Sequence, residues 1–253
     1  MWPVFVINMA ENTRRLARCA DELDAVGIDW IRLEAVDGRA LSAADLAGVY
    51  DAETNRRRAK HPLVPPEIGC YLSHIAAWER IAAGDAPGGI VLEDDFRITR
   101  DLKTAIERLA ANADGWDLTK LFSFKPVKLR GTPRDLGQGF VLGTPTRVPS
   151  TTLGYAITKA GAQKLADQAR PFFRPVDEDH KFFWEYDLNV AMLLPCPIAI
   201  GEQDTVSGTV GEVRRKAGRG DDRSLLTRVW LGLKYRVGYM TGLYISRLKG
   251  RSR

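Results

Sequence analysis

Gly89-Ile90-Val91-Leu92-Glu93-Asp94-Asp95 is an apolar run that ends in three consecutive acids. A short apolar run that follows glycine is typical of a buried strand in a largely parallel sheet. Carboxylates are costly to bury without partners, and ligands of open α/β sheets bind at the carboxyl ends of the strands. The stretch therefore predicts an α/β fold with a cation site where this strand ends.

Alternation along a strand would put Glu93 and Asp95 on one side and Asp94 on the other. Two neighbouring hard oxygen ligands with open coordination positions suit Mn²⁺ or Mg²⁺ carrying a substrate diphosphate. We therefore predict Glu93 and Asp95 as metal ligands. The alternative is a solvated acidic turn that caps the next helix.

Composition and cysteine usage favour a globular, cytoplasmic protein. The chain has 253 residues, of which 45% are hydrophobic and 27% charged, as in ordinary globular domains. No apolar stretch approaches the ~20 residues of a membrane span, and the first residues lack the features of a signal peptide. Cys19, Cys70 and Cys196 form no CxxC and no even framework, so we expect reduced thiols.

The basic residues are concentrated at the carboxyl end. Residues 214–253 hold twelve Lys or Arg and two acids, a net charge of +10, whereas the whole chain carries +5, so residues 1–213 carry −5. This asymmetry predicts a catalytic body, residues 1–212, and a basic docking tail, residues 213–253.

The pattern along the body alternates between strands and helices. A strand over 4–9, a helix over 13–26 and a strand over 30–36 would form the β-α-β unit that begins nucleotide-binding sheets. Residues 50–66 read as a loop, and Pro66 opens a helix that runs to about residue 83. Residues 125–150 read as loops with a short hairpin. Further expected elements are helices over 102–111 and 159–169 and strands over 116–124, 151–158 and 195–200.

Several motifs follow one another in an order found in a known family. They are Val6-Ile7-Asn8 followed by Arg14-Arg15, Glu34-Ala35-Val36-Asp37-Gly38, the run from Glu67 to His74 with Trp78, Leu92-Glu93-Asp94-Asp95, Gly154-Tyr155 with Gly161-Ala162 before Pro175-Val176-Asp177, and Gln203 with Ser207. Over residues 3–210 the chain resembles glycosyltransferase family 25, which includes lipooligosaccharide and collagen galactosyltransferases.

The resemblance implies a GT-A-like (Rossmann-like) nucleotide-sugar-binding sheet flanked by helices, with the basic helical tail outside it. It implies metal-dependent, inverting transfer of galactose or glucose from a UDP-sugar donor, with Mn²⁺ (or Mg²⁺), to a glycan or glycolipid acceptor. The default acceptor is a bacterial cell-surface glycan such as lipopolysaccharide or lipooligosaccharide.

Six residues are expected to bind the donor. Arg14 or Arg15 could contact phosphate, Asn8 and Asp37 could read uracil or ribose hydroxyls, and the resemblance adds His74. Asp94, between the two predicted metal ligands, completes the set. Asn8 could instead cap the first helix, Arg14 could be a solvated charge, and Asp37 before glycine is a turn former in any case.

Inverting transfer also needs a base on the acceptor hydroxyl. Asp177 is the first choice because it matches the Pro-Val-Asp of the family, with Asp179 and then Glu178 as alternatives. Either aspartate could instead cap the next helix. The nearby rings of Phe183, Trp184 and Tyr186 could stack on an acceptor sugar or belong to the core.

Apolar residues of the tail from Leu225 to Tyr244 recur at helical spacing with Arg and Lys among them. A basic amphipathic helix with Trp and Tyr predicts an anionic membrane surface as partner, at the inner face of the cytoplasmic membrane. The alternative is a terminal helix packed on the body.

Two other functions remain open. One is a non-catalytic protein on a degenerate transferase fold that binds membrane or nucleic acid through the tail and the basic residues 56–60. The intact acidic triplet argues against it, and we expect no nucleic-acid partner. The other is a metal-dependent phosphohydrolase, but the chain has only three histidines and lacks the motifs of two-metal sites.

Overall fold

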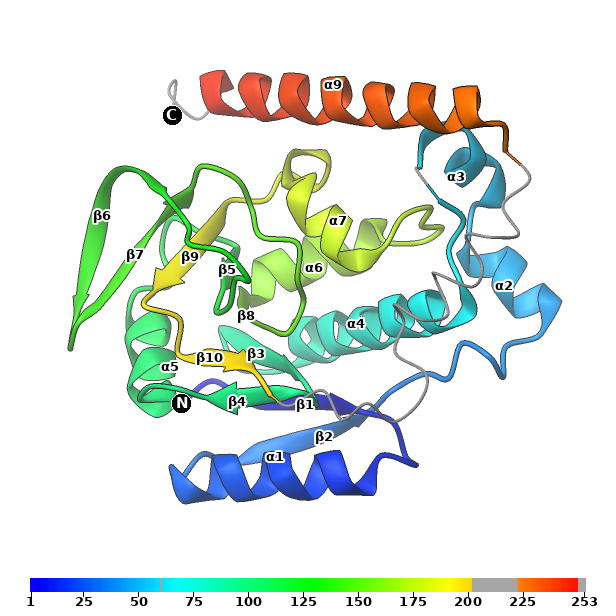
Figure 1. The fold of residues 1–253 in the computed structure, drawn as a ribbon. Coiled ribbons are helices and arrows are strands. Elements are labelled where there is room, and N and C mark those ends of the chain that lie inside the picture. Colours follow the sequence, from blue (N-terminus) through cyan, green and yellow to red (C-terminus); the bar gives the residue numbers. More distant parts are fainter. Residues whose placement is uncertain (60, 202–222, 250–253) are drawn as a thin grey trace.

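The structure is a computed structural model that describes residues 1–59, 61–201 and 223–249. Its centre is an eight-stranded sheet of order β2-β1-β3-β8-β5-β9-β7-β6, beside which β4 and β10 pair as a separate small sheet (Figure 1). The strands are β1 (Val4–Asn8), β2 (Trp30–Glu34), β3 (Gly88–Glu93), β4 (Phe96–Ile98), β5 (Leu118–Lys120), β6 (Leu129–Gly137), β7 (Phe140–Pro145), β8 (Gly154–Thr158), β9 (Val190–Leu194) and β10 (Ile198–Ile200).

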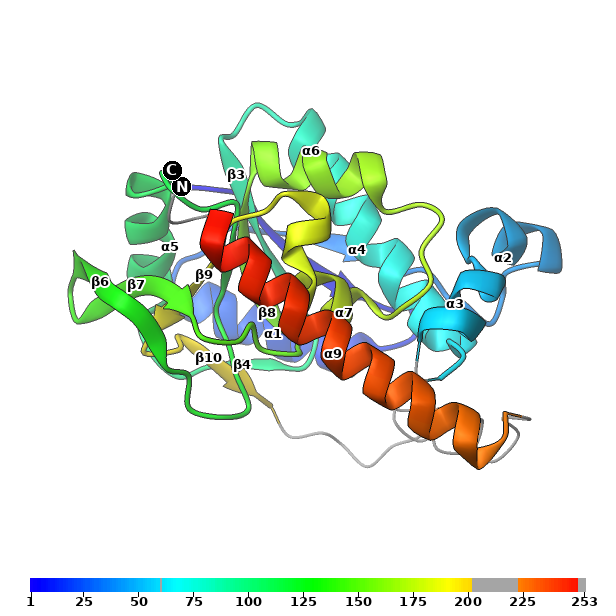
Figure 2. The same ribbon diagram turned by 90° about the horizontal axis from the view of Figure 1, so that it is seen from above.

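Helices cover both faces of this sheet (Figures 1 and 2). They are α1 (Thr13–Ala25), α2 (Ala43–Val49), α3 (Ala52–Arg58), α4 (Pro65–Ala83), α5 (Leu102–Ala111), α6 (Lys159–Gln168), α7 (Val176–Lys181), the 3₁₀ turn η1 (Phe183–Tyr186) and α9 (Leu225–Lys249). In the described part of the chain, no helix combines the length and hydropathy needed to cross a bilayer.

Strand alternation divides the core into two layers. Val4 and Val6 of β1 face a cluster that contains α1 and α5, whereas Phe5 and Ile7 face a cluster that contains α4 and α6. Because successive side chains point to opposite faces, a strand whose residues are all apolar must be buried on both sides. β1 is buried throughout, as this pattern requires.

The sequence predicted the first half of the sheet correctly and the second half only in part. β1 is parallel to both β2 and β3, as expected for a β-α-β unit. β8 is antiparallel to β3 and β5, and β7 is antiparallel to β6 and β9. β5 and β9 are again parallel, so the sheet is mixed, and the expected parallel arrangement holds for β2, β1 and β3 and for the β5–β9 pair.

Residues 50–66 were expected to form a loop, which is wrong for most of the segment. Asp51 accepts a hydrogen bond from the Thr54 amide at 2.8 Å and caps α3, because a side-chain acceptor at this position satisfies a free amide of the first turn. The helix expected from Pro66 is confirmed as α4, which begins one residue earlier.

The C-terminal helix expected from the tail is present as α9 and packs on the body. Leu231, Tyr239 and Leu243 are buried, and a Cβ at Gly242 would overlap the Trp184 ring. The helix crosses η1 and reaches α3 at its other end (Figure 2). One face of α9 is thus part of the fold.

Candidate active site

The carboxyl ends of β1, β3 and β5 bring polar side chains to one edge of the sheet. β8 is antiparallel to β3 and β5, so these two strands run in the same direction and end beside the start of β8. Glu93 ends β3, Lys120 ends β5, and Thr151 and Thr152 come just before β8. This is the edge at which open α/β sheets bind ligands.

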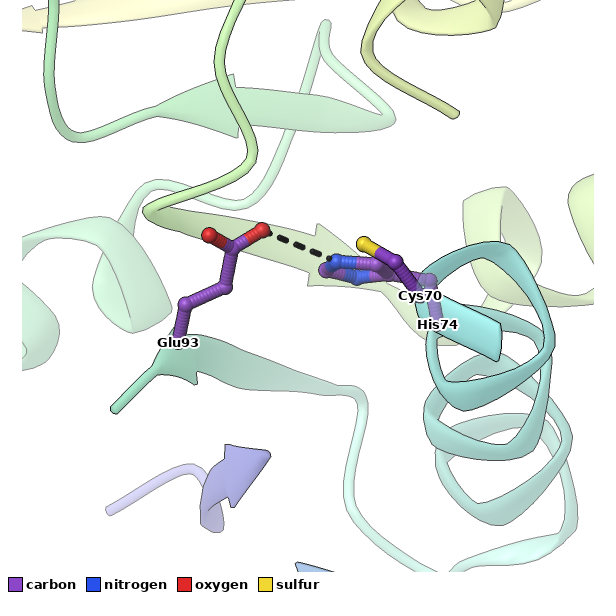
Figure 3. Close-up of side chains that lie close together, drawn as sticks. All are labelled: Cys70, His74 and Glu93. Atoms are coloured by element: carbon purple, nitrogen blue, oxygen red, sulfur yellow. Dashed lines mark hydrogen bonds and ion pairs between the residues drawn. The ribbon is translucent and has the colours of Figure 1, made fainter. Parts of the chain in front are cut away.

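Glu93 is fixed by a chain of hydrogen bonds that starts in the core. The indole of Trp78 donates to the Tyr155 hydroxyl at 2.8 Å, and this hydroxyl lies 3.0 Å from Nδ1 of His74. Nε2 of His74 lies 3.2 Å from Oε1 of Glu93 (Figure 3). The same oxygen also accepts from the Thr152 hydroxyl. An ionised carboxylate only accepts, so we assign the His74 proton to Nε2, and Nδ1 then accepts from Tyr155.

These donors keep Glu93 charged. Burial disfavours the ionised form, but hydrogen bonds from His74 and Thr152 outweigh it and hold the pKa of Glu93 below its usual range. The strand therefore ends in an ionised carboxylate of fixed orientation.

Asp95 has the opposite environment. Burial, followed by the charges of Glu93 and Asp94, raises the pKa of Asp95 to about 7. Its buried Oδ1 has no hydrogen-bond partner among the described residues. A buried oxygen without a donor is destabilising, and a cation between Glu93 and Asp95 would both neutralise the repulsion and supply the missing partner. The donor set fits Mn²⁺ or Mg²⁺.

Asp94 points away from these two, toward β1 and α1. Its carboxylate accepts from Nδ2 of Asn8 at 2.7 Å and pairs with Nη1 of Arg15 at 3.0 Å. Its backbone oxygen accepts from Arg18 at 2.9 Å. Three of the predicted donor-binding residues, Asn8, Arg15 and Asp94, are thus brought together, but they bind one another and anchor the turn after β3 to α1.

Cys70 lies next to His74 and Glu93, and the ligand atoms of the three lie within 4.8 Å of one another (Figure 3). Burial, followed by the charge of Glu93, raises the pKa of the Cys70 thiol well above its usual range. The helix that carries the thiol, α4, can approach the Val36 carbonyl closely because Gly69 has no side chain; a Cβ there would overlap that carbonyl. A thiol, an imidazole and a carboxylate could together hold a thiophilic cation such as Zn²⁺.

Lys120 is fully buried at the end of β5. Its ammonium donates to the Thr151 carbonyl at 2.5 Å and lies 2.7 Å from Nδ1 of His180. Desolvation lowers the pKa of Lys120 to about 7, while the charges of Asp177 and Glu93 act in the opposite direction. A lysine that titrates near neutrality beside two carboxylates is a functional candidate on physical grounds.

The two aspartates proposed as bases have different surroundings. Asp177 lies in the first turn of α7 and is close enough to the strand-end site for its charge to act on Cys70 and Lys120. Asp179 is buried, pairs with Arg174 and accepts from the Tyr71 hydroxyl. Asp177 is therefore the better candidate, because its charge reaches the strand-end site, whereas Arg174 and Tyr71 hold Asp179 in the core.

The remaining predicted residues lie outside this cluster. Asp37 pairs with Arg39 at 2.8 Å, and hydrogen bonds from Arg39 lower the pKa of Asp37. Arg14 is exposed on α1. Trp184 packs under α9 at Gly242, which favours core packing over acceptor stacking for this ring.

Some of the predicted features lie in residues 202–222, which the structure does not describe. Gln203, Ser207 and the boundary between residues 212 and 213 fall outside the described residues. Lys120 and Thr152 were not predicted as site residues. A signal for Lys120 was present, since it is the only basic residue within the strand expected over 116–124.

A charged site at the strand ends of an α/β sheet is typical of enzymes that bind phosphorylated or nucleotide ligands. Comparison with known families makes the class specific. Residues 1–131 match the family described as glycosyltransferase family 25 (LPS biosynthesis protein), and the chain belongs to this family.

Similar proteins include active and inactive members by name. A glycosyltransferase 25 family member of Aedes aegypti is 31% identical over 187 residues, which cover 69% of this chain and 30% of that protein. Procollagen galactosyltransferase 2 of Homo sapiens is 31% identical over 189 residues, 69% of this chain and 29% of that protein. Inactive glycosyltransferase 25 family member 3 of Mus musculus is 31% identical over 193 residues, 69% of this chain and 30% of that protein.

The aligned part is thus about 30% of the length of these curated relatives. Among solved structures, HddC from Yersinia pseudotuberculosis is similar with a TM-score of 0.39 and 15% identity, over 76% of this chain and 89% of that one. That likeness is too distant to bear on function. Because relatives named inactive are as similar as those named for an activity, the site residues have to decide the function.

Proposed function

We propose that the protein is a metal-dependent, inverting glycosyltransferase that moves galactose or glucose from a UDP-sugar to a glycan acceptor. The acceptor class is a cell-surface glycan such as lipopolysaccharide or lipooligosaccharide. The observation that carries the proposal is the pair at the end of β3. Glu93 is held ionised while a buried oxygen of Asp95 has no partner among the described residues, in a chain that belongs to a transferase family.

Glu93 and Asp95 would hold the Mn²⁺ or Mg²⁺. When bound, such an ion neutralises charge that develops on a departing diphosphate. His74 and Thr152 hydrogen-bond to Glu93 and orient it, and these bonds are expected to raise its affinity for the metal. Lys120, at the end of β5, adds a cation on the same edge of the sheet, and its pKa of about 7 means that its charge changes near neutral pH.

Asp177 is the proposed base. Its carboxylate would take the proton from an acceptor hydroxyl while that oxygen attacks the anomeric carbon of the donor sugar. The bond from this carbon to the diphosphate oxygen breaks, and UDP leaves with the electron pair. Attack from the face opposite the leaving group inverts the anomeric centre.

The test is incubation of the full chain with UDP-galactose or UDP-glucose and Mn²⁺ while UDP release is followed. We expect release that EDTA abolishes and a donor-dependent rise in Tm, since a ligand of the folded state stabilises it. A protein that binds vesicles but gives neither UDP release nor a Tm shift with any UDP-sugar is the non-catalytic alternative. Release of phosphate from simple phosphomonoesters would instead indicate a phosphohydrolase.

We also propose that the outer face of α9 docks the enzyme on the anionic inner face of the cytoplasmic membrane. Large apolar side chains follow one another along the exposed side of this helix. They are Leu226, Val229, Trp230, Leu233, Val237, Met240, Tyr244 and Leu248.

The charges on α9 agree with this partner. The helix contains no acid. Of its cations, Arg236 is exposed, whereas Arg247 donates to the Thr146 carbonyl of the body and Lys234 lines a cavity beneath the helix. Each basic side chain near an anionic surface contributes about 1 kcal/mol, and Trp and Tyr favour the interfacial region.

Docking is tested with Leu233→Glu and sedimentation with vesicles of equal phosphatidylcholine and phosphatidylglycerol. Leu233 is 54% exposed in the middle of the stripe. The substitution should lower binding about tenfold or more, because it puts a charge on the buried face of an interfacial helix. Thr227→Glu adds the same charge to the same helix away from the stripe and should bind nearly as the parent does. If Leu233→Glu leaves vesicle binding unchanged but dissolves a dimer, the stripe contacts a second copy of the chain instead.

A further inference from the structure

A cavity of about 410 Å³ lies between the segment after α3, the start of α7 and the inner face of α9. This volume is within the ~300–1,000 Å³ of typical small-molecule sites. Its lining includes Arg58 and His61 on one side, Asp177 and Glu178 of α7 on another, and Lys234, Tyr235 and Gly238 of α9 on the third.

Asp177 connects this cavity to the strand-end site. The residue lines the cavity, and its charge also acts on Lys120 and Cys70 at the edge of the sheet. Neither Glu93 nor Asp95 lines the cavity. A ligand in the cavity would therefore reach Asp177 without contacting the proposed metal ligands, which leaves the metal free to hold the leaving diphosphate.

The chemistry of the lining suits a sugar. Phe182, Tyr235 and Leu63 provide apolar surface, whereas Asp177 and Glu178 provide carboxylates next to it. A saccharide presents C–H faces to the former and hydroxyl groups to the latter. An acyl chain would offer these carboxylates no hydrogen-bond donor. The lining holds as many acids (Glu67, Asp177 and Glu178) as Arg and Lys residues (Arg58, Arg174 and Lys234), so it offers no net positive charge to a polyphosphate.

We infer that this cavity is the acceptor site, that it binds an uncharged saccharide unit, and that α9 is one of its walls. The inference rests on the proposed function, since it takes Asp177 as the base. It gives the C-terminal helix two faces with different partners. The outer face meets lipid and the inner face meets the sugar, so a membrane-linked glycan would enter beside the helix that docks.

Gly238 offers a direct test. A Cβ there meets nothing within 4 Å, although the residue lines the cavity. Gly238→Trp should fill the cavity from α9 without disturbing the packing beneath. Gly232 is the matched control, since its Cβ also meets nothing within 4 Å and it is not part of the lining. Gly238→Ala is the size control.

The probe is a deacylated lipooligosaccharide, and the readouts are the acceptor KM from acceptor-dependent UDP release and the affinity for UDP with Mn²⁺ by calorimetry. Gly238→Trp should raise the acceptor KM about tenfold or more by occupying the space of a sugar ring. Gly232→Trp should keep it near the parent value, and Gly238→Ala should raise it by less than Gly238→Trp does. The affinity for UDP should be the same in all four proteins.

Each other outcome has a definite meaning. An unchanged acceptor KM in Gly238→Trp overturns the acceptor site, as does an equal rise in Gly232→Trp, which would reflect a general effect on the helix. If the parent binds UDP with Mn²⁺ but the probe never increases UDP release, the saccharide class of ligand is wrong. If the parent does not bind UDP, the proposed function itself fails.

Discussion

Asp95→Asn should stabilise the protein without metal and at the same time abolish its response to Mn²⁺. The carboxyl has a pKa of about 7 in the folded protein against an ordinary 3.8, so the folded state resists its ionisation. At pH above about 7 this difference corresponds to about 4 kcal/mol, since each pKa unit is about 1.4 kcal/mol. We take this as an upper limit and expect about 2 kcal/mol.

The pH dependence has a definite sign. The pKa of Asp95 is higher in the folded state than in the unfolded state. The loss of stability that its ionisation causes is therefore absent below about pH 4, grows between pH 3.8 and about 7, and is complete at higher pH. Asparagine has no charge, so its advantage over Asp95 should widen from pH 5 to pH 8. For a domain of this size about 2 kcal/mol shifts Tm by about 4–8 °C.

The assay is thermal unfolding in EDTA and in Mn²⁺ at pH 5 and pH 8. Asp94→Asn is the matched control on the neighbouring residue. Its carboxylate pairs with Arg15 and accepts from Asn8, so its loss should lower Tm by the equivalent of about 1–3 kcal/mol. Without metal, Asp95→Asn should thus raise Tm and Asp94→Asn should lower it.

Two results would refute this reasoning. If Asp95→Asn lowers the metal-free Tm as Asp94→Asn does, Asp95 is a structural residue with a favourable charge. If Mn²⁺ still raises the Tm of Asp95→Asn as much as that of the parent, the residue is not a ligand.

Three further predictions concern the residues around Asp95. Asp177→Asn should keep the affinity for UDP and Mn²⁺, measured by calorimetry, but lower turnover by about 10²–10⁴-fold through loss of the base; loss of UDP affinity with retained turnover would transfer the role to Glu178. Asp179→Asn should lower Tm by the equivalent of about 3–5 kcal/mol, because it leaves the buried Arg174 without its carboxylate partner; an unchanged Tm with lost turnover would reverse the roles of Asp177 and Asp179. Lys120→Met should raise Tm most below pH 7 and progressively less toward pH 10, because the pKa of Lys120 is about 7 in the folded state, below the usual value of 10.5. A rise in Tm that does not depend on pH would show that the lysine titrates normally.

The sequence predicted the elements whose signal is local. β1, α1 and β2 follow from apolar periodicity, and α4 follows from the paired prolines at its start. The charged end of β3 follows from the run before it. Each of these depends on residues within a few positions of one another, where propensity and alternation are informative.

What the sequence could not predict depends on partners far along the chain. α3 was taken for a loop because its residues are polar, although its carboxyl end packs near Glu185 and α9. The antiparallel direction of β8 is set by how the chain returns after the β6–β7 hairpin, and no periodicity encodes that. Lys120 reads as an ordinary solvated charge until β8 and α7 enclose it.

The acidic triplet shows why a motif alone does not assign roles. Alternation treats Glu93 and Asp95 as equivalent, yet β3 ends at Glu93 and the next two residues form a turn. His74, 19 positions away in the sequence, then holds Glu93 ionised, and Asn8, 86 positions away, takes up Asp94. Asp95 is the carboxylate left with an unpartnered buried oxygen among the described residues. Its predicted role as a ligand therefore rests on the hydrogen-bond donor that its buried oxygen lacks, because carboxylates with strongly perturbed pKa values cluster at functional sites.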